Sequence, residues 1–181
     1  TINVKAPDVR GAVTNVTTSQ ARFTIAALQP AAGGGGVLDW VTFVPSTGGR
    51  PTTETTGALT HNGAGNYTYL FKTDIKSDPK YDDTKTHRLA IQISGTGFKA
   101  TNATADFILA TGYPAGATVT DTRDVVLTAA CNDCHERLGV NTTTSLANGF
   151  HGGGRYETKY CVVCHNPGRA SGRTNTARAV D

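Results

Sequence analysis

The stretch HGGGRYETKYCVVCHNP spans residues 151–167 and contains the pattern Cys-x-x-Cys-His. The same five-residue pattern occurs once more, as CNDCH at residues 131–135. The chain has four cysteines and five histidines in 181 residues, so the two patterns use every cysteine and two of the histidines. From Asn141 onward the large apolar residues are too few to build a core of side chains. Something other than side chains is therefore expected to fill the interior of this region.

Upstream of these patterns the sequence is typical of short strands joined by turns. In NYTYLFK, Tyr67, Tyr69 and Phe71 share one face of a strand, and in HRLAIQIS the face of Leu89 is also apolar. Stretches rich in Gly, Pro, Asn and Ser separate the apolar runs. The predicted strands are residues 21–28, 37–44, 66–72, 87–94 and 103–110. This spacing predicts a mainly β N-terminal domain over residues 1–115, an antiparallel Greek-key sandwich or a small barrel.

The repeated Cys-x-x-Cys-His pattern is the attachment signature of c-type haem. Two cysteines three residues apart lie on one helical turn, where they reach the two vinyl groups of a porphyrin and form thioethers. The histidine that follows is then placed to bind the iron as the proximal ligand. A covalently tethered haem also supplies the apolar volume that the side chains of this region lack. The sequence therefore predicts two haem c groups.

Zinc, disulfides and thiol redox chemistry account for the cysteines less well. A zinc ribbon separates its cysteine pairs by roughly 15–20 residues, whereas 26 residues lie between the pairs here, and zinc requires no histidine after each pair. Disulfides within each pair would close loops too short to stabilise the fold. A thioredoxin-like redox motif lacks its βαβ context.

A six-coordinate haem iron needs a second axial ligand, and the chain contains no methionine. His151 is the best candidate because it lies between the two patterns and precedes three glycines, which allow the backbone to pass close to a porphyrin. The spacing leaves open which iron it binds. His87, on the apolar face of its predicted strand, and His61, in a predicted turn, are weaker candidates. Haem propionates could pair with basic residues, namely Arg155, Lys159, Arg169 and Arg173.

The second part of the chain, residues 116–181, is predicted to be a loop-rich dihaem module with short helices. Residues 111–124 are polar, with Gly, Pro and Thr, and are typical of a linker. A short helix is expected to begin within DVVLTAACNDCHERLG, with Asp121 or Thr122 as its N-cap.

With the preceding CNDCH, the stretch HGGGRYETKYCVVCHNPGR resembles the haem-binding modules of the OmcA/MtrC family, the outer-surface multihaem cytochromes of metal-respiring bacteria. The resemblance covers residues 125–181 and implies a β-barrel-like Greek-key domain followed by a haem-bearing domain. Family members repeat this arrangement, so the chain is expected to be an N-terminal portion of a longer protein or a smaller dihaem relative. The resemblance assigns one haem to Cys131, Cys134 and His135, a second to Cys161, Cys164 and His165, and a distal ligand role to His151.

The expected function is electron transfer through the two haems. The resemblance implies metal oxides, flavins or a partner cytochrome as acceptors, and other multihaem cytochromes or an outer-membrane electron conduit as partners. One alternative is a multihaem reductase or small-ligand-binding protein with one five-coordinate iron; another is a surface-binding β module that carries haems. Whether the chain is an enzyme stays open, with a non-enzymatic carrier favoured over a metal reductase.

Charge and compartment add few constraints. The formal net charge of +3 does not indicate a nucleic-acid partner, and self-association stays open. No apolar run approaches the roughly 20 residues of a membrane span. Because haem is attached to cysteines outside the cytoplasmic membrane, the protein is predicted to be exported, to the outer membrane, the cell surface or the medium, with the periplasm as the alternative.

Overall fold

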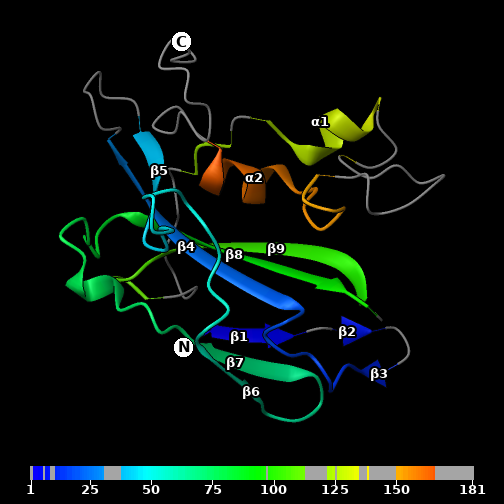
Figure 1. Cartoon of the computed structure of the whole chain (residues 1–181). Helices are drawn as coiled ribbons and strands as arrows, with labels where there is room; N and C mark the ends of the chain where they lie inside the picture. Colours follow the sequence, from blue (N-terminus) through cyan, green and yellow to red (C-terminus); the bar gives the residue numbers. More distant parts are fainter. Residues whose placement is uncertain are drawn as a thin grey trace.

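The computed structural model describes residues 2–5, 7–8, 11–30, 38–96, 98–112, 122–124, 126–134, 138 and 150–165. Antiparallel sheets are the main regular structure of this part of the chain, as drawn in Figure 1. One sheet has the strand order β5–β4–β8–β9, with bounds Leu38–Thr42, Ala21–Pro30, Thr86–Gly95 and Phe98–Ile108. A second sheet has the order β1–β7–β6, with bounds Ile2–Lys5, Asn66–Leu70 and Ala58–His61. The remaining elements are β2 (Pro7–Asp8), β3 (Gly11–Ala12), the 3-10 helix η1 (Ile75–Ser77), α1 (Thr128–Asn132) and α2 (Thr158–Cys164).

The prediction of a mainly β fold with a few short helices is confirmed. Each predicted strand is present, although the stretch predicted as 103–110 is the end of a longer strand, β9. The N-cap prediction was wrong, because α1 begins at Thr128 with Leu127 at its N-cap position and no side-chain cap. Among the described residues, no helix combines the length and the apolar character that a bilayer span requires.

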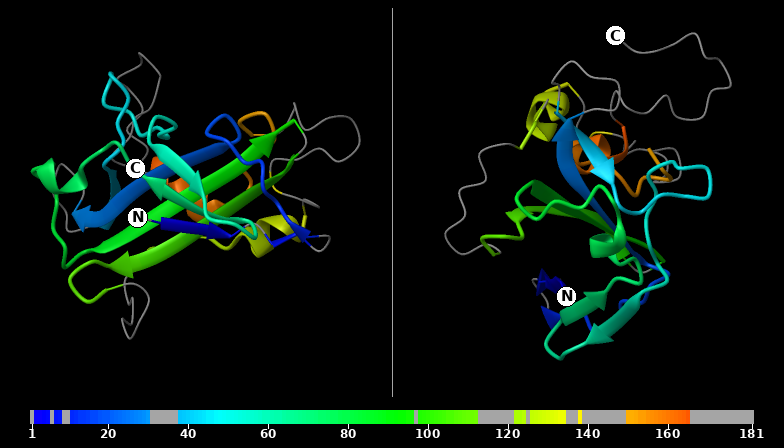
Figure 2. Two further views of the ribbon diagram at one scale, coloured as in Figure 1. Left: turned by 90° about the horizontal axis from the view of Figure 1, so that it is seen from below. Right: turned by 90° about the vertical axis from the view of Figure 1, so that its left-hand side faces the viewer.

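The inner core lies between the two sheets and is mainly aromatic. Phe23 of β4 stacks on Tyr69 of β7 with ring centroids 3.7 Å apart, and Phe71 meets both rings edge-on. Tyr67 is 2% exposed and donates its hydroxyl to the carbonyl of Val13 at 2.9 Å. The alternation in NYTYLFK therefore points the expected residues inward. The two sheets face each other as a sandwich, seen from two further directions in Figure 2.

The four-stranded sheet is buried on its outer face as well. Along β8, Leu89 and Ile91 point to the inner core, while Arg88, Ala90 and Gln92 point outward and are also buried. The segment around α2 covers this outer face (Figure 1). Its core consists of Ala26, Leu28, Trp40, Ala90, Tyr160 and Val163. The predicted boundary between residues 1–115 and 116–181 stays a prediction, and across it the two parts share this outer core.

The register of β8 and β9 places polar side chains in pairs on the outer face. Arg88 lies opposite Asp106, and Gln92 lies opposite Asn102. Side chains of one face alternate along each strand, so both pairs face the segment that covers the sheet. This register places the side chains of β8 and β9 that contact the segment around α2.

Glu54 lies in the segment that leads from β5 of one sheet to β6 of the other, and it connects this segment to the inner core. Its backbone pairs with Phe23 of β4 through two hydrogen bonds of 2.7 and 3.1 Å. Its carboxylate is 7% exposed and accepts hydrogen bonds from Tyr69 Oη, from the backbone N–H groups of Lys72 and Thr73, and from Thr73 Oγ1. Burial alone would raise the pKa of Glu54, but these hydrogen bonds outweigh it and hold the pKa below its ordinary value.

We predict that Glu54→Gln lowers the free energy of unfolding by about 1–3 kcal/mol at neutral pH, because it weakens a set of buried, charge-assisted hydrogen bonds. Since the pKa of Glu54 is lower in the folded state, its contribution is complete above the unfolded value of 4.5 and is lost as the pH falls through the folded value. Urea denaturation at pH 7 and about pH 3.5 should show that the gap between wild type and variant shrinks on acidification. As a control, Asp78→Asn, which removes a surface pair with Lys80, should change the free energy of unfolding little. An equal gap between wild type and Glu54→Gln at both pH values would contradict the prediction.

Candidate haem site

The second cysteine pattern lies on α2, the helix that covers the outer face of the four-stranded sheet. Cys161 and Cys164 are three residues apart within this helix, are partly buried and form no disulfide. His165 follows as the C-cap residue, and its backbone N–H donates to the carbonyl of Cys161 at 2.8 Å. Tyr160 and Val163 of the same helix are buried against the sheet. The helix thus uses its own apolar side chains on the sheet, and neither of its thiols is used in a disulfide.

The glycine run after His151 forms a tight turn against β8. His151, Gly152 and Gly153 have positive φ values of 52°, 68° and 76°, a run that glycine adopts without strain and histidine rarely adopts. A Cβ atom on Gly154 would lie 2.5 Å from the side-chain nitrogen of Gln92. The glycines therefore serve the turn and its contact with the sheet, which gives them a structural reason besides the predicted approach to a porphyrin.

This turn brings His151 to His165. The ring centroids are 6.1 Å apart and the ring planes are inclined by 57°. Two imidazoles that bind one metal ion from opposite sides, with each nitrogen about 2 Å from the metal, have centroids about 6 Å apart. The donor set therefore suits the two axial positions of a haem iron. The other proximal candidate, His135, lies outside the described residues.

Burial and one nearby cation, Arg155, shift the pKa values of side chains at the site. Burial lowers the pKa of His151, and Arg155 lowers it further. Burial raises the pKa of the Cys161 thiol, and Arg155 opposes that rise. Burial also raises the pKa of Tyr160 to about 12. At neutral pH His151 is accordingly neutral, which is the form of imidazole that binds a metal.

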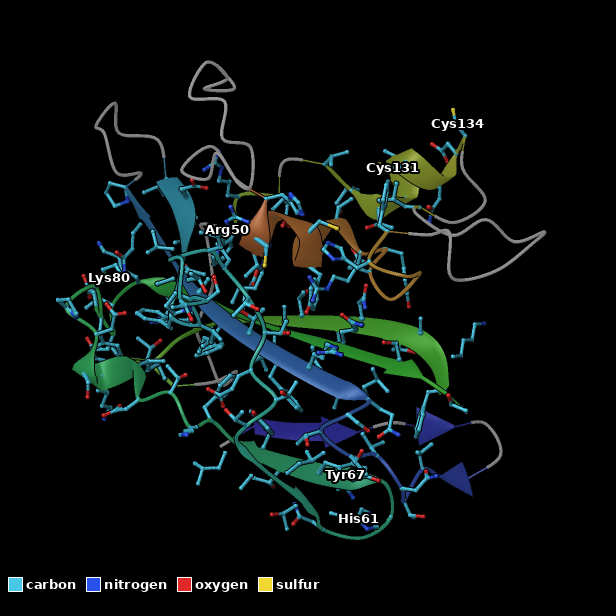
Figure 3. All side chains as sticks on the ribbon, in the orientation of Figure 1. Arg50, His61, Tyr67, Lys80, Cys131 and Cys134 are labelled. Carbon is cyan, nitrogen blue, oxygen red and sulfur yellow. The ribbon has the colours of Figure 1, made fainter. Side chains whose placement is uncertain are left out.

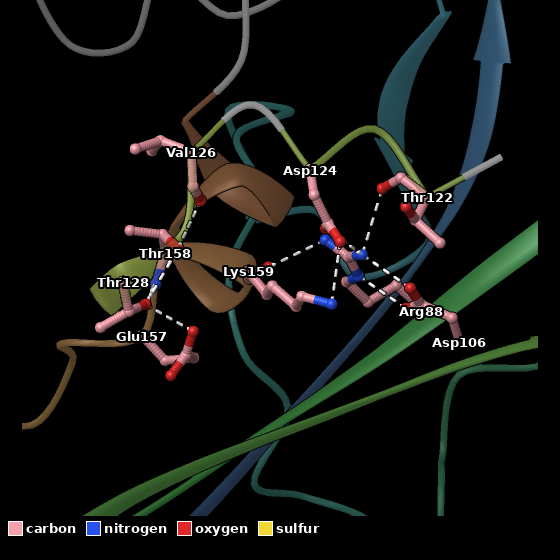
Figure 4. A network of polar contacts seen from close by, with 9 residues as sticks. All are labelled: Arg88, Asp106, Thr122, Asp124, Val126, Thr128, Glu157, Thr158 and Lys159. Carbon is pink, nitrogen blue, oxygen red and sulfur yellow. Dashed lines mark hydrogen bonds and ion pairs between the residues drawn. The ribbon is translucent and has the colours of Figure 1, made fainter. Parts of the chain in front are cut away.

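The first cysteine pattern begins on α1. Cys131 is partly buried and Cys134 is exposed, and neither forms a disulfide. Thr128, the first residue of α1, ties this helix to the start of α2: its hydroxyl donates to Glu157 and accepts from the backbone N–H of Thr158 at 2.8 Å. Thr158 in turn donates its hydroxyl to the carbonyl of Val126 at 2.8 Å. Figure 4 shows this cluster, which ties the start of α1 to the start of α2.

Arg88 anchors this region to the sheet, and its role was not predicted from the sequence. Its side chain is fully buried and forms a two-point ion pair with Asp106 at 2.6 and 2.7 Å. It also donates to the carboxylate of Asp124 at 3.1 Å and to the carbonyl of Lys159 in α2 at 3.3 Å, as drawn in Figure 4. Its guanidinium carbon lies 4.3 Å from the ring centroid of Trp40. No local pattern could have found it, because Arg88 lies on the face of β8 opposite to that of Leu89 and Ile91, where a charged residue usually meets water.

Further contacts fasten the segment between the turn and α2. Asn102 of β9 donates its amide to the carbonyl of Gly154 at 2.8 Å and accepts from the backbone N–H of Tyr156 at 2.9 Å. Tyr156 donates its hydroxyl to the carbonyl of Ala100 at 3.1 Å. Among the four residues proposed as propionate partners, Lys159 pairs with Asp124 at 2.8 Å, and Arg169 and Arg173 lie outside the described residues.

The two spare histidines are not brought to the cysteines. His87 is fully buried on the inner side of the sheet, stacked between Phe43 and Phe107 at 5.8 and 5.7 Å, and burial lowers its pKa. His61 is exposed at the end of β6, 4.8 Å from the ring of Tyr67. Figure 3 shows His61 on the far side of the molecule from Cys131. A ligand role for either histidine stays a prediction.

Comparisons with known proteins all find cytochromes of the MtrC type. Residues 123–181 match the family model described as outer membrane cytochrome MtrC/MtrF-like, domains II/IV. The multiheme cytochrome MtrC of Shewanella baltica (strain OS185) is 31% identical over an alignment 179 residues long, which covers 90% of this chain and 26% of that protein. The crystal structure of MtrC from Shewanella baltica OS185 matches with a TM-score of 0.60 and 27% identity, over 85% of this chain and 25% of that one. The chain thus spans about a quarter of these relatives.

We predict that Arg88→Met destabilises the protein by about 3–5 kcal/mol, because it leaves the carboxylates of Asp106 and Asp124 without their buried cation. The double variant Arg88→Met/Asp106→Leu should recover part of this loss, since both charges of the tightest pair are then gone. Chemical denaturation measures both values, and the single tryptophan, Trp40, reports loosening of the same contact by fluorescence. Arg50→Met, at an exposed position, is the matched control; equal losses for the two single variants would refute the anchoring role.

Proposed function

Because the chain belongs to the OmcA/MtrC family of multihaem cytochromes, we propose that it transfers electrons through two covalently attached c-type haems. Cys131 and Cys134 would hold one haem, and Cys161 and Cys164 the other, each pair through two thioethers. Two cysteines three residues apart on a helix, neither in a disulfide, support this assignment for the second pair. A haem supplies an iron that changes its oxidation state by one electron.

The observation that carries the proposal is the approach of His151 to His165, with ring centroids 6.1 Å apart. We assign these two histidines as the ligands that would hold one iron, that of the haem that Cys161 and Cys164 would attach. An iron with two histidine ligands has no open position for a substrate, so this site favours electron transfer over ligand binding or catalysis. The turn at residues 151–154 fixes the distal histidine, and the end of α2 fixes the proximal one.

The remaining residues hold the two haem-bearing helices in place. Thr128 and Thr158 keep α1 beside α2, which would place the two haems as neighbours and shorten the step between them. Arg88 fixes α2 on the sheet. We propose that residues 1–115 act as a rigid base and that residues 116–181 form the electron-carrying module.

The setting of the protein is part of the same proposal. Attachment of haem to cysteines takes place outside the cytoplasm, so we propose an exported protein at the outer membrane or cell surface. Its partners would be other multihaem cytochromes or an outer-membrane electron conduit, and its final acceptors would be metal oxides or flavins.

We predict that wild-type protein carries two covalently bound haems by intact-mass measurement and that the haem attached through Cys161 and Cys164 is low-spin. His151→Ala should convert this one haem to a high-spin form that binds carbon monoxide when reduced, because its iron loses a ligand. Absorption and electron paramagnetic resonance spectra measure the change. His61→Ala removes an exposed histidine of the other sheet and should leave both spectra as they are. Two low-spin haems in His151→Ala would disprove the ligand assignment, and a wild type without covalent haem would disprove the function.

A further inference from the structure

Arg155 lies at the base of the turn that presents His151. Its backbone N–H donates to the carbonyl of Phe150 at 3.4 Å and closes the turn. Its guanidinium carbon lies 5.2 Å from the ring centroid of Tyr160, the residue before Cys161 in α2. The side chain therefore reaches from the segment of one proposed iron ligand to the helix that carries the thiols.

The sheet holds this guanidinium in a fixed orientation. Arg155 Nε donates to the side-chain oxygen of Gln92 at 2.8 Å, and the amide nitrogen of Gln92 donates to Ser94 Oγ at 2.7 Å. Gln92 is 5% exposed and Tyr160 is 1% exposed, so both supports of the cation are themselves buried. A side chain held on two sides in this way keeps its charge at one position.

The charge of Arg155 is not neutralised by a carboxylate within ion-pair distance among the described residues. The two other cations of the region differ, because Arg88 pairs with Asp106 and Asp124, and Lys159 pairs with Asp124. Arg155 therefore brings its positive charge to the turn of His151 and to the helix of Cys161.

We propose that Arg155 raises the reduction potential of the haem held by Cys161, Cys164 and His165 and so directs the electron toward this haem. The inference rests on the proposed function. Reduction adds one negative charge at the iron. A fixed cation that pairs with no carboxylate in the described part of the chain, beside a partly buried site, stabilises that added charge. The remaining N–H groups of the guanidinium suit a propionate. Such a pair would keep the sign of the effect, because it offsets an anion on the porphyrin.

The test compares reduction potentials of the complete, haem-loaded protein by spectroelectrochemical titration. The haem at His165 is identified beforehand as the one that becomes high-spin in His151→Ala. Arg155→Gln should shift the reduction equilibrium of that haem toward the oxidised form by at least about threefold, which is about 28 mV at about 59 mV per tenfold change, and should shift the other haem less. Arg155→Lys should retain most of the wild-type potential. If Arg155→Gln does not retain both haems, Arg155→Met, whose chain still packs on Tyr160, replaces it.

Lys159→Gln is the matched control, because it removes a nearby cation whose charge Asp124 already neutralises. Its shift should be well below that of Arg155→Gln. An unchanged potential in Arg155→Gln, an equal shift of both haems, or an equal shift in Lys159→Gln would overturn the inference. These outcomes are separate from a failure of the proposed function, which would show as missing covalent haem or as a high-spin wild-type iron at His165.

Discussion

The buried guanidinium of Arg88 connects three parts of the chain that are distant in sequence. Its partner on the sheet is Asp106, its partner in the connecting segment is Asp124, and the carbonyl of Lys159 receives its third contact from α2. Burial opposes the charge of Arg88, but its carboxylate partners more than compensate, so its pKa is raised and it stays a cation. Separating any of these parts would leave a charge or a polar group without a partner in an apolar layer. The position of α2, the helix that carries Cys161 and Cys164, on the sandwich follows from this contact.

The four-stranded sheet serves two cores at once. Its inner face packs on the smaller sheet through Phe23 and Leu89, and its outer face packs on α2 through Ala26 and Ala90. Sheets of antiparallel strands often leave one face to water, so burial of both faces marks this sheet as a middle layer. A middle layer ties the rigidity of the sandwich to the geometry of the site, because a shift of β8 would move both cores.

The sequence predicted the inner core well and the outer core poorly. The alternation around Tyr67 and Tyr69, and the inward direction of His87, follow from a period of two and need no knowledge of the rest of the chain. Arg88 and Gln92 lie on the other face of the same strand, where polar residues usually meet water. Their burial depends on α2 and the turn before it, which arrive about 65 residues later in sequence, so no local pattern indicates it.

The sequence likewise predicted the proposed haem ligands only in part. Both cysteine patterns predict their own thiols and proximal histidines, because the chemistry of attachment is local. His151 could be selected as a distal ligand by elimination, but its partner could not, since several residues must first take left-handed conformations. The contact of Gly154 with Gln92 and the hydrogen bond of Arg155 to the same side chain complete the placement. These are tertiary facts with no signature in residue spacing.

The direction of α2 separates its apolar side chains from its sulfur atoms. Tyr160 and Val163 occupy the sheet side of the helix, while Cys161 and Cys164 stay partly exposed and Cys134, just after α1, is open to solvent. α2 therefore packs on the sheet through side chains other than its cysteines, so a bond formed at either sulfur atom would remove no contact of the outer core.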